Sequence, residues 1–321
     1  MAEKLENIIL FDWLSFSSKI DSPESIKKLL GLEHCPWILT AGAQGYKSRW
    51  YFECISIHFD GKVNSVWVEM SGQGCRAYES YSTCCNWNGL FNMIYTDTDN
   101  YTINRLDVAY DDWTGILDIK KLDDNARKQN IVTKFRDYGV ERSYSKEDIT
   151  LYFGSKKSDV LFRCYNKAAE RKREDVPHWV RFEMQLRDER AFTFVSNFIQ
   201  SDHDVGQCFL GVLNNYLRFV KPCGDSNKRR WDTAPFWRRF VGDVDNISLF
   251  TKKDIEYNYM QLKNFVLNQA GNAIDCLITI DGIDKFCEDL KNRDSNPNPK
   301  YLSLLDSILM DRVHNGEGVA F

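Results

Sequence analysis

The strongest constraint on the fold is a strict alternation of side chains in two segments, residues 161–167 and 180–187. With a period of two, Arg163, Tyr165 and Lys167 project from one side of a strand, and apolar residues project from the other. The second segment alternates in the same way between apolar and charged or amide side chains. Strands of this kind form a sheet with one apolar face packed on a core and one polar face.

The composition is typical of a folded, soluble protein. The chain has 321 residues, of which 43% are hydrophobic and 14% aromatic, enough for two compact domains. Its longest apolar runs fall short of the roughly 18 residues that span a membrane, and its first residues lack a signal-peptide pattern, so we expect a cytoplasmic protein with no membrane partner. The ten cysteines are scattered without metal-binding spacing and are expected to be reduced thiols. A net charge of −4 means that any contact with DNA must come from local basic patches.

The order of elements predicts an α+β fold. Residues 21–32 read as a helix, with Asp21 or Ser22 as cap, Pro23 in the first turn and Gly31 at the end. Two β-rich runs follow, with a hairpin turn expected at Asp60–Gly61. Strands and helices then alternate without a glycine-rich phosphate loop, which favours a mainly antiparallel sheet with helices on one face.

The period changes from strand-like to helix-like near Ala191. We therefore expect two domains: residues 1–200 as a catalytic domain, and residues 201–321 as a smaller helical domain that binds DNA or forms a dimer.

Acidic residues on the polar sides of strands are candidate metal ligands. Asp107 and Glu183 each project opposite apolar neighbours and could meet above adjacent strands. Paired carboxylates suit a hard cation such as Mg²⁺ or Mn²⁺, and the five histidines contain no His-x-His pair. Glu69 is a third candidate ligand, and Arg76, expected just after a turn at residues 71–74, is a candidate phosphate clamp.

Structural interpretations of the same residues remain open. Asp107 could simply pair with Arg105, and Glu183 with Arg181 or Arg187. A strand tyrosine between cations is, taken alone, an ordinary residue of an amphipathic surface.

Two nearby polar residues favour a structural interpretation. Asp112 faces the apolar side and is expected to cap a turn. His178 could be an acid or base beside the site, but at the start of a strand a solvated histidine is the simpler reading.

A basic and aromatic stretch lies at residues 228–240. It contains four arginines, called here the arginine cluster: Arg229, Arg230, Arg238 and Arg239. Arginines can contact phosphates and the neighbouring aromatic rings can stack on unpaired bases, or the rings can anchor the segment in the core while the arginines stay in water. Lys156 and Lys157, in a loop between strands, offer an alternative DNA-binding surface.

Four segments occur in an order and spacing that resembles a known family: "EMSGQGCRAYE", "RLDVAYDD", "TLYFGSKKSDVLFRCYNKAAER" and "WVRFEMQLR". They are similar to the Rep_trans family of rolling-circle replication initiators and the related relaxases of plasmids, phages and integrative conjugative elements. The resemblance implies a degenerate His-hydrophobe-His endonuclease fold, in which acids replace much of the usual histidine pair. It implies that Tyr165 attacks the phosphate at the nick site and that Asp107 and Glu183 hold the metal, whereas Glu69 matches a family motif that by itself implies no ligand role.

The implied chemistry explains the residue types. A tyrosine hydroxyl has an ordinary pKa of about 10, so nearby cations such as Arg163 and Lys167, or a metal, are needed to favour the phenolate. Attack by tyrosine would leave a 5′-phosphotyrosine and a free 3′-hydroxyl, and the linkage would keep the phosphodiester energy for resealing.

We therefore expect a DNA strand-nicking enzyme that initiates rolling-circle replication or conjugative transfer. Two alternatives stay open: a metal-dependent nuclease that uses water, with Tyr165 structural, and a non-catalytic origin-binding protein. The expected partner is origin DNA, double-stranded with a single-stranded nick site. A host helicase and a second copy of this chain are further candidate partners.

Overall fold

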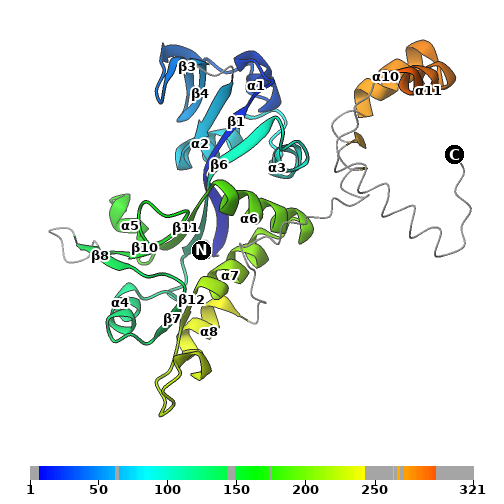
Figure 1. Ribbon diagram of the computed structural model, residues 1–321. Coiled ribbons are helices and arrows are strands. Elements are labelled where there is room, and N and C mark those ends of the chain that lie inside the picture. Colours follow the sequence, from blue (N-terminus) through cyan, green and yellow to red (C-terminus); the bar gives the residue numbers. More distant parts are fainter. Residues whose placement is uncertain are drawn as a thin grey trace, which may run out of the picture. The chain divides into compact units, whose positions relative to one another are not determined.

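The computed structural model describes residues 7–61, 65–142, 149–173, 175–242, 263, 266–267 and 271–293 (Figure 1). Contacts between residues separate two units. The first comprises Met1–Asn86 and Thr98–Phe250, and the second comprises Trp87–Asp97 and Thr251–Phe321. All the functional residues expected from the sequence belong to the first unit.

A ten-stranded sheet forms the frame of the first unit, and each strand runs antiparallel to its neighbours. Across the sheet the strands are β2 (Ile38–Ala41), β3 (Tyr46–Phe52), β4 (Ile55–Gly61), β5 (Val66–Met70), β1 (Ile8–Ser18), β6 (Tyr101–Asp112), β11 (Val180–Arg187), β10 (Val160–Asn166), β9 (Ile149–Phe153) and β8 (Tyr138–Arg142). A separate pair consists of β7 (Ile131–Thr133) and β12 (Leu217–Phe219). The α+β fold with a mainly antiparallel sheet is thus confirmed.

Helices connect and cover these strands. In the first unit they are α1 (Pro23–Leu29), α2 (Gly72–Tyr81), α4 (Ile119–Arg127), α5 (Lys167–Glu170), α6 (Asp188–Gln200), α7 (Val205–Tyr216), the 3-10 turn η1 (Lys228–Arg230) and α8 (Pro235–Val241). The expected start of α1 is confirmed, because Ser22 caps it through a capping box with Ser25, and Gly31 follows its end with a φ of +63°.

One face of the central strands is apolar. Cross-strand partners share a face, and the register pairs Met184 of β11 with both Val108 of β6 and Phe162 of β10. Helix α6 packs on β6 and β11, and α7 packs on α6 and β1 (Figure 1). Trp237 of α8 lies 6.1 Å from Phe182 between ring centroids. All five side chains are fully buried, which contributes roughly 1.5–3 kcal/mol for each. The opposite face of the same strands carries the charged residues.

The segment after residue 200 is organised differently from the expectation. Helices α7 and α8 and strand β12 group with the sheet of the first unit, whereas the sequence assigned residues 201–321 to one helical domain. Strand β12 lies within a stretch that reads as helix, because its partner β7 is about 85 residues away in the sequence and leaves no local pattern.

The region of residues 46–70 forms three strands instead of the expected two. The extra turn joins β3 to β4 through Glu53 and Cys54, whose φ angles are +42° and +65°. Neither residue is a usual former of such turns, so the sequence gives no signal there. The expected position of the hairpin turn was wrong, because Asp60 and Gly61 are the last two residues of β4 and Gly61 is paired with Tyr46 of β3. The next residues lie outside the described part of the chain.

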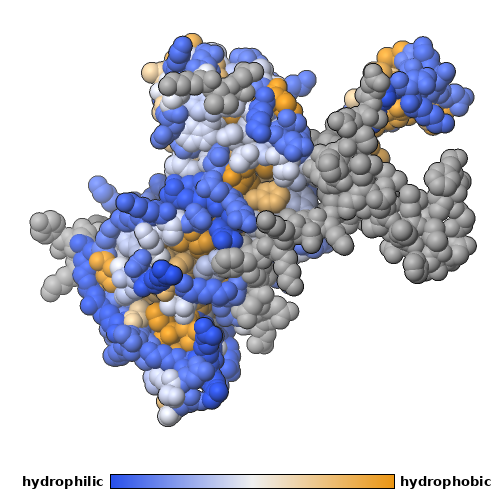
Figure 2. All heavy atoms as spheres, viewed as in Figure 1, coloured by the Kyte–Doolittle hydropathy of each residue, from blue (hydrophilic) through white to orange (hydrophobic). Residues whose placement is uncertain are grey.

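The described part of the second unit is helical. It contains α3 (Trp87–Thr96), α10 (Gly271–Asp281) and α11 (Ile283–Asn292). Helices α10 and α11 contact each other across Gly282, whose φ is +82°. Across the described ranges, no helix is long and apolar enough to cross a membrane. The visible surface is mostly hydrophilic, with scattered apolar patches (Figure 2).

Candidate nicking site

The polar face of β6, β11 and β10 brings the expected catalytic residues together. Arg163 of β10 lies directly opposite Glu183 of β11, and Tyr165 lies opposite Arg181. Asp107 of β6 is paired with Gln185, so its side chain is the diagonal neighbour of Glu183. The alternation seen in the sequence therefore places the tyrosine and both acids on one surface.

Tyr165 is held between an acid and a cation. Its hydroxyl donates to Oε2 of Glu183 at 3.0 Å, and Nζ of Lys167 donates to the hydroxyl oxygen at 3.4 Å. Lys167 is the first residue of α5 rather than part of the strand, and it is almost fully buried. Its ammonium group also pairs with Glu170. The tyrosine is thus positioned by neighbours on both sides of its hydroxyl.

The surroundings of Tyr165 raise the pKa of its hydroxyl, whereas the sequence led us to expect cations that favour the phenolate. Burial, together with the nearby Glu183 carboxylate, raises the pKa of Tyr165 well above its ordinary value, although Arg181 acts to lower it. Arg163 does not offset this effect, because its guanidinium already pairs with Glu183 and with Asp107. In this state the site favours the phenol, and Glu183 is placed to accept its proton.

Two arginines neutralise the acid pair. Nη2 of Arg163 donates to Oε1 of Glu183 and lies 3.4 Å from Oδ2 of Asp107. Nε and Nη2 of Arg105 donate to the two carboxylate oxygens of Asp107, at 2.8 and 2.6 Å, and the guanidinium lies 4.1 Å from the ring of Trp13. The structural pairing of Asp107 with Arg105 is therefore real. Glu183, however, pairs with Arg163 rather than with Arg181 or Arg187.

The two acids differ in their affinity for a proton. Burial raises the pKa of Asp107 to about 7, and the Glu183 charge adds to this effect while Arg105 opposes it. Burial also acts to raise the pKa of Glu183, but the Arg163 ion pair outweighs it, and the pKa ends below its usual value. Only 1% of Asp107 and 4% of Glu183 are exposed. The pair can therefore carry one negative charge and one proton near neutral pH.

A second charge network lies beside Tyr165 and was not found from the sequence. Arg181 binds Asp111 with two hydrogen bonds of 2.7 Å and Asp12 with a contact of 2.8 Å. Asp12 reaches this position because the pairing of β1 with β6 is irregular between Phe11 and Trp13. With a strict period of two, Asp12 would share a side of the strand with the buried Leu14, and the bulge removes this conflict.

Glu69 lies apart from the acid pair. On β5 it is paired with Ser15 of β1, whereas Asp107 of β6 is paired with Trp13. Burial raises the pKa of Glu69, and the charges of Arg105 and Arg49 act to lower it. Within the described residues, no group of three or more Asp, Glu, His or Cys side chains is arranged to hold a metal ion. The paired Asp107 and Glu183 still fit Mg²⁺ or Mn²⁺, because such ions are often held by one or two carboxylates together with substrate phosphate.

The other expected residues lie at the margins. Arg76 is in α2 rather than after a turn, and its guanidinium donates to the carbonyl of Phe11 and to Glu79. Lys156 and Lys157 are both exposed, and Lys156 pairs with Glu141.

The arginine cluster is fully on the surface, whereas Trp237 beneath it is buried. The aromatic rings of this segment anchor it, as the structural interpretation held.

Asp112 and His178 have structural roles. The carboxylate of Asp112 accepts hydrogen bonds from the backbone of Thr114, Gly115 and Leu117, so the expected turn cap is confirmed. Nε2 of His178 lies 3.1 Å from the same carboxylate. This contact is with a turn on the apolar side of the sheet, away from the tyrosine.

Comparison with known proteins assigns the family. The model of the family described as "Replication initiation factor" (Rep_trans) matches residues 101–292, which include Tyr165 and both acids. The chain belongs to this replication initiation factor family. A second model, "Rolling Circle replication initiation protein N-terminal domain", matches residues 8–93. The resemblance read from the sequence is confirmed.

Two relatives of this replication initiation factor cover most of its length. It is 28% identical over 256 residues to the putative DNA relaxase NicK of Bacillus subtilis (strain 168), covering 75% of this chain and 72% of that protein. It is similar in structure to the rolling circle replication initiator protein from Geobacillus stearothermophilus, with a TM-score of 0.68 and 29% identity. That similarity covers 77% of this chain and all of the other.

Proposed function

We propose that this replication initiation factor nicks one strand of an origin, with Tyr165 as the nucleophile. The observation that carries the proposal is the hydroxyl of Tyr165, bound to the Glu183 carboxylate on the central strands and flanked by Lys167. Membership of the family and the two relatives support origin DNA as the substrate. Nicking starts either rolling-circle replication or conjugative transfer, since both need the same cut.

The chain's own groups supply the proton transfer. The Tyr165 hydroxyl gives its proton to Glu183 while its oxygen forms a bond to phosphorus, and the bond from phosphorus to the 3′ oxygen breaks. The 3′ oxygen takes a proton from water. The product is a 5′-phosphotyrosine, which keeps the energy of the phosphodiester for resealing.

Arg163 and Lys167 act on the phosphate. Arg163 is 28% exposed at its side chain, so an incoming phosphate can reach its guanidinium and draw it away from Glu183. This exchange frees the carboxylate to accept the tyrosine proton and places a positive charge beside the developing negative charge. Lys167 supplies a second cation next to the attacking oxygen.

The metal ion is part of the proposal. Asp107 and Glu183 would hold Mg²⁺ or Mn²⁺ together with the substrate phosphate, whereas Glu69, which lies apart on β5, is left out of this ligand set. A bound cation supplies charge withdrawal from the phosphate oxygens. The arginine cluster, with Lys156 and Lys157, is proposed to contact the DNA backbone, because these side chains are exposed. A host helicase and a second copy of the chain remain proposed partners.

A denaturing gel tests the proposal. The protein is incubated with a labelled single-stranded oligonucleotide from the origin of its own genetic element and Mn²⁺. A covalent adduct is expected, Tyr165→Phe should abolish it, and Tyr152→Phe should not. Tyr152 is a matched control because its hydroxyl lies on the same face but is bound to Glu141.

The same gel separates the alternatives. Cut DNA without adduct would indicate the nuclease that uses water. Binding without cleavage would indicate a non-catalytic origin-binding protein.

A further inference from the structure

A cavity of about 420 Å³ lies beside the proposed nucleophile. Its walls come from the start of β1, the first turn of α2, the end of β6, the region of α5 and the start of β11. Lys167 lines this cavity and also lies 3.4 Å from the hydroxyl of Tyr165. The cavity therefore begins one side chain away from the proposed point of attack.

The lining of the cavity is cationic. It includes Arg76, Lys167, Arg171, Arg173 and Arg181, against only two carboxylates. Both carboxylates, those of Asp12 and Asp111, are already bound to Arg181. Arg171 and Arg173 are exposed at the rim. Arg76 and Lys167 pair with Glu79 and Glu170, and Arg173 pairs at the surface with Asp175. An entering phosphate would therefore meet Arg171 directly and would compete with an exposed carboxylate for Arg173.

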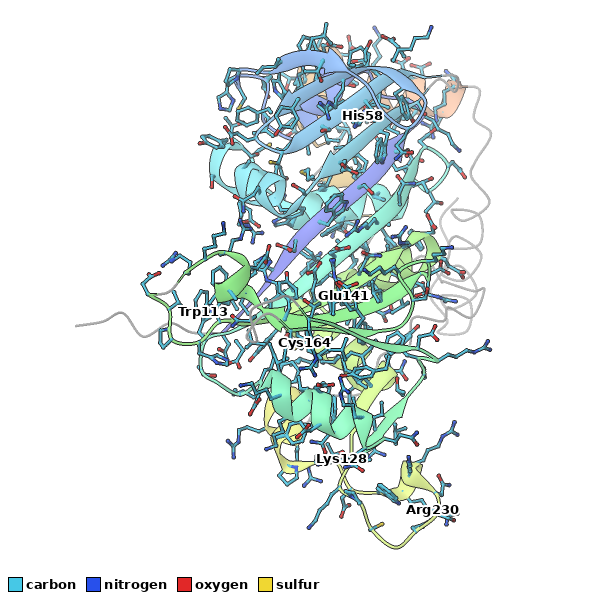
Figure 3. The ribbon with its side chains drawn as sticks, turned by 90° about the vertical axis from the view of Figure 1, so that its left-hand side faces the viewer. His58, Trp113, Lys128, Glu141, Cys164 and Arg230 are labelled. Carbon is cyan, nitrogen blue, oxygen red and sulfur yellow. The ribbon has the colours of Figure 1, made fainter. Side chains whose placement is uncertain are left out.

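One wall of the cavity is aromatic. The rings of Trp113 and Trp179 are stacked, with centroids 4.4 Å apart and planes 21° from parallel. Both tryptophans are half-buried, and Figure 3 places Trp113 next to α5, at the end of the central strands. Ile8 and Leu10 add apolar surface from β1. Stacked aromatic rings beside cations are the combination that binds an unpaired base together with its phosphate.

We propose that this cavity binds the nucleotide next to the scissile phosphate, turned out of the strand, with its base on the Trp113–Trp179 stack and its phosphate on Arg171 and Arg173. The proposal rests on the proposed function, since it takes the nicked strand as the ligand. It accounts for the expectation that the nick site is single-stranded, because a paired base cannot enter the cavity. The seated nucleotide then fixes the scissile phosphate against Tyr165.

Binding is tested in the Tyr165→Phe protein, so that no chemistry intervenes. Fluorescence anisotropy measures its affinity for labelled single-stranded (dT)12 at low salt. Trp113→Ala is expected to weaken binding by roughly 5- to 100-fold, the loss found when one base–aromatic stack is removed. Trp113→Phe should stay within about threefold of the parent, because it keeps an aromatic ring. These two variants separate loss of stacking from loss of folding.

The control is Trp50→Ala. Trp50 is also a half-buried tryptophan beside a cation, with Lys27 at 3.6 Å from its ring, but its register partner Ile57 places it on the apolar face. This variant should bind (dT)12 as the parent does. The duplex (dT)12·(dA)12 should be insensitive to Trp113→Ala, because its bases are paired.

Photo-cross-linking locates the base directly. An oligo-dT carrying one 5-iododeoxyuridine is irradiated with the Tyr165→Phe protein, and a cross-link to Trp113 or Trp179 is expected. Unchanged affinity of Trp113→Ala, or cross-links confined to other segments, would overturn the proposal. These readouts do not depend on cleavage. If the protein forms a covalent adduct but Trp113→Ala binds (dT)12 as the parent does, only the proposed nucleotide-binding role of the cavity is rejected. If Trp113 is cross-linked but no adduct forms, only the proposed nicking function is rejected.

Discussion

Replacing Arg181 by methionine should strongly destabilise the first unit. Arg181 is 5% exposed and makes hydrogen bonds of 2.7 Å to Asp111, which is 1% exposed, and a 2.8 Å contact to Asp12. These carboxylates raise the pKa of Arg181 against the opposing effect of burial. The network joins β1, β6 and β11, so its loss affects the strands that carry the site.

The expected magnitude follows from the charges left behind. Removing one partner of a buried ion pair costs about 3–5 kcal/mol, because the remaining charge is buried without compensation. That is a large share of a total stability of roughly 5–15 kcal/mol. With a urea m-value of about 2.5 kcal/mol/M, the unfolding midpoint should fall by roughly 1–2 M.

Urea unfolding followed by tryptophan fluorescence measures this shift. Arg173→Met, which breaks an exposed pair with Asp175, is the matched control and should change the midpoint little. Adding Asp111→Asn and Asp12→Asn to Arg181→Met should restore part of the loss, because the buried negative charges are then removed. A shift of less than about 0.4 M for Arg181→Met would refute the reasoning.

Three further outcomes are expected. His58 is buried, its Nδ1 accepts a hydrogen bond from the backbone N–H of Ala43, and burial lowers its pKa to about 4. The protein should therefore lose up to about 3 kcal/mol of unfolding free energy as the pH falls from 6.5 toward 4. The urea midpoint of His58→Gln should fall less over this pH range than that of the parent, and an equal fall would contradict the assignment. Asp107→Ala or Glu183→Ala should remove nicking in Mg²⁺ or Mn²⁺, and a chelator should do the same to the parent; full activity in chelator would argue against the metal. Alanine at all four positions of the arginine cluster should flatten the log–log dependence of duplex affinity on salt by roughly one unit per lost contact, and an unchanged slope would move the binding surface to Lys156 and Lys157.

The residues on the polar face of the sheet were predicted well from the sequence. Alternation with period two is a local property, so the sides taken by Tyr165, Glu183 and Asp107 could be read from each strand alone. The helix at Pro23–Leu29 was equally predictable, because the residues that cap and end it lie directly beside it in the sequence.

Partner choice on that face could not be predicted. The sequence suggested Arg181 or Arg187 as the partner of Glu183, and the register of β10 against β11 selects Arg163 instead. Asp12 joins the network through a bulge that depends on the pairing of β1 with β6. The direction of the pKa shift at Tyr165 was missed for the same reason, since it follows from burial and from a cation already engaged by acids.

The most direct test of the account is the identity of the residue linked to DNA. The protein is reacted with its single-stranded nick-site oligonucleotide and Mn²⁺, the adduct is digested with nuclease and protease, and the modified peptide is sequenced by mass spectrometry. The account predicts a nucleotide linked through its 5′ phosphate to Tyr165, within the peptide that contains Cys164 and Asn166. A nucleotide on any other residue, or cleavage with no linked peptide, would contradict it.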